Sequence, residues 1–180
     1  NTNLCKDMRL FISGSAPLTS NTWNIFLKKT GHKILERYGM TETGMISSNP
    51  YSIKKRKAES VGWPLPDVEV RISKKKLNLN DNIGEIQVKG PNVFKNYWKI
   101  ENRNKDFTQD GFFKTGDLGK IDNEGRIYIV GRQKDLIITG GLNVYPKEVE
   151  DKLNEINEIK ESAVIGIPDK DFGETVVAVL

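Results

Sequence analysis

The stretch MRLFISGSAPLTSNTWNIFLKKTGHKILERY, residues 8–38, decides the fold at the start of the chain. Residues 8–12 form a short apolar run that leads into a turn of small residues. A helix follows, with a hydroxyl cap at residue 19 or 20, apolar residues at helical spacing and an end at Gly31. Residues 33–38 have the pattern of a second strand. Strand, helix and strand at this spacing predict a βαβ unit at the edge of a parallel α/β sheet.

The sequence pattern changes from residue 61 to residue 130. Short alternating runs are separated by Pro, Gly and Asn-Asp, which is typical of antiparallel β structure and also fits a small barrel. The clearest runs lie at 68–72, 84–88 and 126–130. Residues 122–125, Asp-Asn-Glu-Gly, predict a hairpin turn.

A third pattern begins after residue 131. A strand is predicted at 135–139, and two glycines then form a corner. Pro146 stands at the permissive first position of a helix whose apolar stripe would contain Val149, Leu153 and Ile156. Two further strands are predicted, at 162–167 and 176–180.

Composition excludes several classes of protein. No stretch approaches the roughly 20 apolar residues of a transmembrane helix, and the first residues contain no signal-peptide core. A single cysteine and a single histidine exclude a disulfide framework, a cysteine-based zinc site and a His-rich metal centre. We expect an intracellular protein, in the cytoplasm or an organelle. Without an initiator methionine, and with an apolar strand at its end, the chain is also expected to be a piece of a longer protein.

The net charge of +4 comes with two basic clusters, at residues 54–57 and 74–76. A basic cluster can bind nucleic acid, but neither cluster is interleaved with the aromatic residues that single strands require. Lysine is also a weaker reader of bases than arginine. We therefore interpret both clusters as solvated loops and expect no nucleic-acid partner.

Four segments contain more glycines, hydroxyls and carboxylates than packing requires. Small residues at 13–18 would let a planar ligand approach the backbone at the carboxyl end of a strand. Residues 36–43, ERYGMTET, run from a strand into a loop whose hydroxyls and carboxylate could bind phosphate and Mg²⁺. In FFKTGDLG, residues 112–119, an Asp in a turn could accept hydrogen bonds from both ribose hydroxyls. In 131–150, Arg132 offers a rigid fork for a ribose or phosphate.

Each segment alone is also explained by an ordinary turn or loop, but their order is specific. The chain resembles the adenylate-forming superfamily of acyl-CoA synthetases, luciferases and adenylation domains, and it is most similar to malonyl-CoA synthetases. The runs that carry the resemblance are ERYGMTET (36–43), KGPNVFKNYW (89–98), FFKTGDLG (112–119), ITGGLNVYPKEVE (138–150) and ESAVIGIPDKDFGE (161–174).

The resemblance implies an α/β plus β fold, namely the C-terminal part of a large αβ/β-barrel adenylation domain followed by the start of a small mobile α+β domain. The large domain would cover residues 1–131, with 1–50 α/β and 60–131 mostly β. The hinge would lie at 132–134, and the truncated small domain would cover 135–180.

The resemblance also implies ATP, Mg²⁺ and coenzyme A as ligands, with a small carboxylate as the substrate. Tyr38 would stack on the adenine and Thr41 would contact phosphate. Glu42 would hold Mg²⁺, and Asp117 would bind the ribose hydroxyls with Arg132 close by. The remaining residues implied in nucleotide binding are Ser15, Ala16, Pro17, Glu36, Arg37, Gly39 and Met40.

Two further features of the family concern its second step, the transfer of the acyl group to coenzyme A. Lys134 falls at the hinge position, and Gly140 and Gly141 fall where a loop lines the pantetheine channel. A charged side chain that binds the ligand next to the hinge can couple formation of the adenylate to rotation of the small domain. The family's glycine-rich phosphate loop and its C-terminal catalytic lysine have no counterpart in residues 1–180, so this chain alone is expected to be nearly inactive in adenylation.

The acyl substrate is the open choice. Malonate has a second carboxylate whose pocket needs a cation, for which an arginine is best suited. Arg37 is expected to be occupied within the motif strand, and Arg9 begins a predicted core strand. The deciding arginine is therefore expected upstream of the chain, while Ser15 could offer a hydroxyl. We favour a malonyl-CoA synthetase. The alternatives are a medium- or long-chain fatty acyl-CoA synthetase, or a non-catalytic interaction module derived from one.

Overall fold

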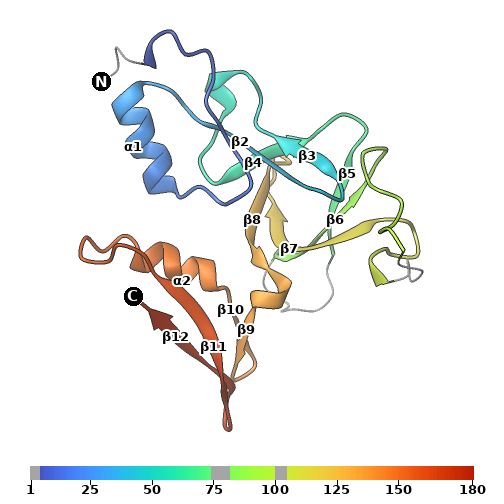
Figure 1. The fold of residues 1–180 in the computed structure, drawn as a ribbon, viewed down its shortest axis with the longest axis vertical. Helices are drawn as coiled ribbons and strands as arrows, with labels where there is room; N and C mark the ends of the chain where they lie inside the picture. Colours follow the sequence, from blue (N-terminus) through green and yellow to red (C-terminus); the bar gives the residue numbers. More distant parts are fainter. Residues whose placement is uncertain (1–4, 74–81, 100–104) are drawn as a thin grey trace.

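The computed structural model describes residues 5–73, 82–99 and 105–180 and arranges them around two β-sheets (Figure 1). The strands of the larger sheet are β1 (Ile12–Ser13), β2 (Leu35–Met40), β3 (Gly44–Ser48), β4 (Ser60–Pro64), β5 (Glu69–Ser73), β6 (Gly84–Lys89), β7 (Phe113–Ile121) and β8 (Ile127–Arg132). Their order in the sheet is β1-β2-β3-β4-β8-β7-β6-β5. The smaller sheet contains β9 (Ile137–Thr139), β10 (Leu142–Val144), β11 (Ala163–Asp169) and β12 (Gly173–Val179), in the order β10-β9-β12-β11. The helices are α1 (Ser20–Thr30) and α2 (Pro146–Leu153), with short 3-10 helices η2 (Ile53–Lys55) and η4 (Gln133–Asp135).

The predicted βαβ unit is confirmed at the edge of the larger sheet. β1 pairs with β2 in parallel, and α1 connects them. The side chain of Thr19 caps α1 by accepting a hydrogen bond from the backbone N–H of Thr22, and Gly31 ends the helix in the left-handed conformation. The first strand is shorter than predicted, because only Ile12 and Ser13 pair with β2. All other strand pairs within the described residues are antiparallel.

The predicted antiparallel middle region is also confirmed, with one correction. Residues 113–119 were expected in a turn, but they lie inside the nine-residue strand β7. Phe113, Thr115 and Asp117 alternate toward the buried face, as in an ordinary strand. Gly116 has a positive φ of 74°, so this strand contains a local irregularity that resembles a turn in the sequence. The turn predicted at 122–125 connects β7 to β8.

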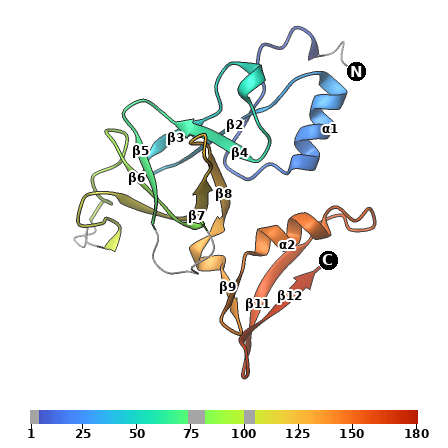
Figure 2. The same ribbon diagram turned by 180° about the vertical axis from the view of Figure 1, so that it is seen from behind.

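Within the described residues, two clusters of buried apolar side chains stabilise the structure. The first is the core of the larger sheet, and its buried members are Tyr38, Ile46, Val61, Ile86, Val88 and Ile127. In the second, Leu118 and Val130 of the larger sheet pack with Tyr145, which directly precedes α2. The second cluster therefore joins the larger sheet to the part of the chain that carries α2. Seen from behind, α2 lies between the smaller sheet and the rest of the molecule (Figure 2).

The part of the chain after β8 follows the prediction with three differences, the first of which is that β10 was not predicted. Asp135 lies in η4, so the predicted strand begins only at Ile137. The two glycines of the corner form the turn between β9 and β10. α2 begins at Pro146, as predicted, but it ends at Leu153. Ile156 was expected on the apolar stripe of this helix; it lies beyond the helix end and is 46% exposed, so that prediction was wrong.

The first basic cluster is only partly the solvated loop that was expected. Lys54 and Lys55 are exposed in η2, but Arg56 is 7% exposed and donates to three backbone carbonyls, those of Lys33, Pro50 and Tyr51. The buried guanidinium ties the loop after β3 to the start of β2. The second cluster, 74–76, lies outside the described residues. No helix in the described part of the chain is long and apolar enough to cross a membrane.

Candidate functional site

A cleft of about 1020 Å³ lies between the larger sheet and α2. It is lined by most of the residues that the sequence implicated in nucleotide binding, although they come from four separate segments. They are Ser15, Ala16, Pro17, Glu36, Arg37, Tyr38, Gly39, Met40, Asp117 and Arg132. The folded chain thus brings together residues that are up to 117 positions apart in the sequence.

Five of the implicated residues lie outside this cleft. Thr41 and Glu42 are in the turn between β2 and β3, directly after Met40. Lys134 lines a neighbouring pocket of about 420 Å³ that shares Arg132 with the cleft. Gly140 and Gly141 have φ angles of +56° and +79°, which a tight hairpin turn requires and which glycine adopts without strain.

Asp117 is the most constrained acid in the cleft. Its side chain is 8% exposed, and its Oδ2 accepts a hydrogen bond of 2.6 Å from the hydroxyl of Tyr38. Its Oδ1 lies 3.2 Å from Nε of Arg132, which is directly opposite in the β7–β8 register. Burial, followed by the nearby Asp117 carboxylate, raises the pKa of the Tyr38 hydroxyl far above its usual range. The carboxylate is therefore held from both sides, with each oxygen keeping capacity to accept a further hydrogen bond.

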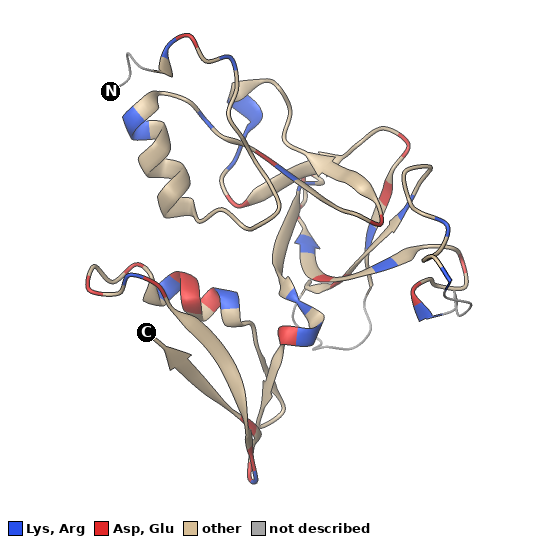
Figure 3. Cartoon of the chain, in the orientation of Figure 1, with Lys and Arg blue, Asp and Glu red and all other residues tan. Residues whose placement is uncertain are grey.

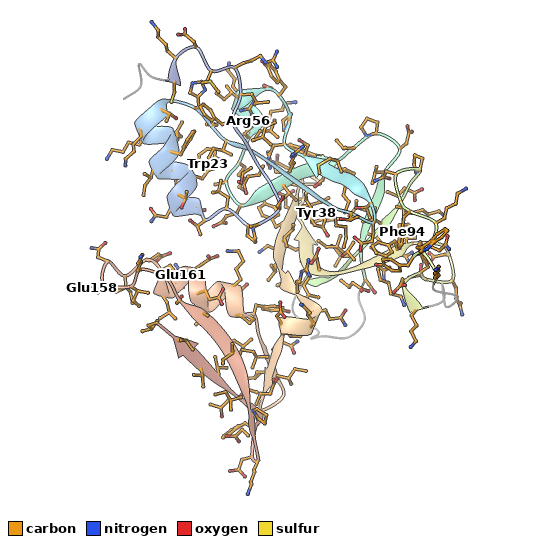
Figure 4. All side chains as sticks on the ribbon, in the orientation of Figure 1. Trp23, Tyr38, Arg56, Phe94, Glu158 and Glu161 are labelled. Carbon is orange, nitrogen blue, oxygen red and sulfur yellow. The ribbon has the colours of Figure 1, made fainter. Side chains whose placement is uncertain are left out.

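Tyr38 lies on β2, near the middle of the molecule (Figure 4). Only 7% of the residue is exposed. Its hydroxyl donates to Asp117, and the residue lines the cleft. Stacking of this ring on an adenine stays a prediction.

Glu36 precedes Tyr38 by two residues on β2 and is 5% exposed. Burial raises the pKa of its carboxyl to about 7. The backbone N–H of Glu59, which donates to Oε1 at 3.1 Å, and the charge of Lys147 on α2 oppose this rise, while the carboxylate of Glu59 adds to it. Glu36 is thus a titratable group near neutral pH in the wall of the cleft.

Arg37 differs from its sequence-based interpretation. Its side chain was expected to be occupied within the motif strand, but it is exposed in the cleft. No hydrogen bond or ion pair of this guanidinium occurs within the described residues. A Cβ built on Gly14 would lie 3.4 Å from Cγ of Arg37, so the arginine passes close over the small-residue turn, which includes Ser15 at a φ of +71°. Arg9 is exposed as well and is not a core residue.

Glu42 is the candidate metal ligand, and its surroundings fit a minimal site. Its carboxylate is partly exposed at the turn, and its Oε1 accepts a hydrogen bond from the hydroxyl of Tyr97 at 2.9 Å. Within the described residues, no group of three or more His, Cys, Asp or Glu side chains could hold a metal ion. Mg²⁺ in nucleotide enzymes is commonly held by one or two carboxylates together with substrate phosphates, so a single carboxylate is compatible with it.

Sequence reasoning missed the contribution of α2 to the cleft. This helix carries both basic and acidic residues (Figure 3), and they line the cleft together with residues of β2. They are Lys147, Glu148, Asp151 and Lys152, followed by Glu155 after the helix end. The available signal was the Lys147–Asp151 spacing of four, which forms an ion pair of 2.7 Å on one helix face.

Comparison with known protein families identifies the class of protein to which this fold and this cleft belong. The model of the AMP-binding enzyme family matches residues 2–98, more than half of the chain, and the chain belongs to this family.

Individual relatives agree with this assignment. The chain is 42% identical over 177 residues to a malonate–CoA ligase of Arabidopsis thaliana, covering 97% of this chain and 29% of that protein. It is 41% identical over 170 residues to a long-chain-fatty-acid–CoA ligase of Bacillus subtilis, covering 93% and 30%. The crystal structure of ATP-bound MatB from Rhodopseudomonas palustris is similar with a TM-score of 0.91 and 52% identity, over 99% of this chain and 36% of that one. The chain therefore spans about a third of the length of these relatives, and the predicted fold class is confirmed.

Proposed function

We propose that the chain carries the nucleotide site and hinge of an ATP-dependent acyl-CoA synthetase. The observation that supports this most is the convergence of Ser15, Glu36–Met40, Asp117 and Arg132 on one cleft. In the first reaction a carboxylate oxygen attacks the α-phosphorus of ATP, which gives an acyl-adenylate and releases pyrophosphate. In the second, the thiol of coenzyme A attacks the acyl carbon and AMP leaves.

The residues of the cleft have complementary tasks in this scheme. The backbone of Ser15–Pro17 and the strand Glu36–Met40 frame the adenine. Tyr38 and Arg132 orient the carboxylate oxygens of Asp117, and these oxygens accept hydrogen bonds from the ribose hydroxyls. Because these partners are already ordered, binding requires little rearrangement of the site.

The turn after β2 binds the phosphates. Thr41 donates its hydroxyl to a phosphate oxygen, and Glu42 holds Mg²⁺, for which its carboxylate is a suitable hard ligand. When bound, Mg²⁺ neutralises the charge that develops on the departing pyrophosphate.

The second reaction uses the segment after β8. Lys134 lies in η4, whose one backbone hydrogen bond, from Leu136 N–H to the Gln133 carbonyl, is long at 3.4 Å. Such a weakly bonded segment can change its dihedral angles at small energetic cost, which suits a pivot. Gly140 and Gly141 would then line the channel for the pantetheine arm.

We infer that the carboxylate is malonate. The second carboxylate of malonate requires a cation, and Arg37 presents a guanidinium in the cleft that no described acidic residue pairs with. The name of the Arabidopsis relative, a malonate–CoA ligase, is consistent with this choice. The long-chain fatty acid alternative rests on the Bacillus relative, which is almost equally similar.

ATP–pyrophosphate exchange by the full-length protein tests the function. Malonate, methylmalonate, octanoate, palmitate and coumarate are compared, and malonate should give the fastest exchange. Fastest exchange with palmitate would refute malonate as substrate. No exchange with any acid would refute the ligase activity and favour the non-catalytic module.

The substitution Arg37→Leu tests the role of the guanidinium. Exchange with malonate should fall about 100-fold, since an unpaired charge in a binding site is expensive, while exchange with octanoate should change little. Arg9→Leu removes an arginine that does not line the cleft and serves as the control. Equal losses with both acids would show that Arg37 does not read the second carboxylate.

A further inference from the structure

The segment KGPNVFKNYW, residues 89–98, has no role in the proposed reaction, yet it lies against the turn that carries Thr41 and Glu42. The backbone N–H of Phe94 donates to the carbonyl of Glu42 at 2.8 Å. The side-chain amide of Asn92 donates to the carbonyl of Thr43 at 2.7 Å and to that of Met45 at 3.1 Å. Two hydrogen bonds from this segment therefore hold the backbone of the turn, and a third holds the start of β3.

A fourth contact reaches the carboxylate itself. The hydroxyl of Tyr97 donates to Oε1 of Glu42 at 2.9 Å. The ring of Tyr97 packs edge to face on Phe94, with the ring centroids 4.7 Å apart. The tyrosine is 37% exposed.

An aromatic cluster connects this segment to the other half of the site. Phe94 lies among densely packed side chains (Figure 4) and contacts Phe107 and Phe113, with centroids 6.0 and 5.3 Å away. Phe113 is the first residue of β7, and Asp117 follows four residues later on the same strand. The turn with Glu42 and the strand with Asp117 are thus held by the same group of rings.

We propose that Tyr97 is a positioning residue for Glu42: its hydroxyl holds Oε1 so that Oε2 faces the divalent cation bound with ATP. This inference rests on the metal role of Glu42 in the proposed function. A glutamate on a turn has several rotamers, and only some of them direct an oxygen to a given point. A hydrogen bond from outside selects among these rotamers, as partners of metal-binding carboxylates commonly do.

Tyr97→Phe tests this role, because it keeps the ring and removes only the hydroxyl. The concentration of Mg²⁺ that gives half-maximal ATP–pyrophosphate exchange should rise about 10-fold, at the lower end of the range for such partners. The rate at saturating Mg²⁺ should stay close to that of the unmodified protein. As a readout without catalysis, Mn²⁺ binding is followed by electron paramagnetic resonance with α,β-methylene-ATP, and its dissociation constant should rise by a similar factor.

Two variants separate the possible outcomes. Tyr51→Phe removes the hydroxyl of an exposed tyrosine in another loop and should change neither quantity. Glu42→Gln should weaken Mn²⁺ binding more than Tyr97→Phe does, with the nucleotide phosphates as the remaining ligands, and adding Tyr97→Phe to it should have no further effect. If Glu42→Gln weakens Mn²⁺ binding but Tyr97→Phe does not, the positioning role is refuted and the proposed function stands. Unchanged binding in Glu42→Gln would refute the metal assignment and, with it, this inference. A lower rate at every Mg²⁺ concentration with unchanged Mn²⁺ affinity would show that Tyr97 is only structural.

Discussion

Replacing Glu36 by glutamine should remove a pH dependence of stability that this one carboxyl creates. Glutamine has nearly the same shape and keeps an oxygen that can accept the hydrogen bond from the backbone N–H of Glu59. It cannot ionise, so the substitution isolates the effect of the charge. The pKa of Glu36 rises on folding from an ordinary 4.5 to about 7, mainly because of burial.

The sign and size of the effect follow from proton linkage. Since the folded state binds the proton more tightly than the unfolded chain, the stabilising contribution is fully present below pH 4.5 and is lost as the pH rises through about 7. The two pKa values correspond to roughly 3 kcal/mol between acid and alkaline conditions. The free energy of unfolding of the unmodified protein should therefore fall by roughly 3 kcal/mol relative to that of Glu36→Gln over this interval.

Urea unfolding followed by tryptophan fluorescence, from about pH 4 to about pH 8.5, measures this difference. Trp23 is a suitable reporter because it is buried and its indole N–H donates to the carbonyl of Ile34, next to β2. Glu69→Gln, in which the original carboxyl is exposed on β5, is the matched control and should parallel the unmodified protein. A constant difference between the unmodified protein and Glu36→Gln across the whole range would refute the reasoning.

Three further substitutions test other contacts. Tyr38→Phe removes the 2.6 Å hydrogen bond to Asp117, and a hydrogen bond to a charged group contributes about 2 kcal/mol. The KM for ATP should therefore rise roughly 30-fold, and discrimination against 2′-deoxy-ATP should decrease. Unchanged discrimination would contradict the ribose role. Lys134→Pro leaves the single hydrogen bond of η4 intact but fixes a dihedral angle at the hinge. It should spare adenylate formation and stop thioester formation, and equal loss of both in separate half-reaction assays would count against the pivot. Gly141→Ala places a side chain at a φ of +79° and should lower the free energy of unfolding by about 1 kcal/mol in urea titrations; no change would show that the turn relaxes.

Local chemistry explains which elements could be predicted from the sequence. The ends of α1 were correct because a hydroxyl cap and a left-handed glycine act on neighbouring backbone groups. The start of α2 at Pro146 was correct for the same reason. β7 was mistaken for a turn because Gly116 and Gly119 resemble turn residues, whereas pairing with β8 and with β6, which is distant in sequence, makes this segment a strand.

In the candidate site, too, the sequence predicted some residues and misjudged or missed others. The residue types and their order in ERYGMTET and KTGDLG identified the nucleotide segments through a family resemblance. The same reasoning misjudged Arg37, since it considered the strand in which the arginine lies but not the face on which its side chain emerges. It also gave no role to Tyr97, whose contact with Glu42 joins residues 55 positions apart.

The sequence by itself determined the family, the βαβ unit, the antiparallel middle region and ten of the residues that line the cleft. These follow from local backbone preferences and from motifs whose order is specific. Only the tertiary structure decided how those residues are held: Asp117 between Tyr38 and Arg132, Glu36 buried at a pKa near neutrality, and Glu42 against Tyr97. Hydrogen bonds and burial depend on distances between atoms that the chain brings together only when its strands pair, and no sequence spacing specifies those distances.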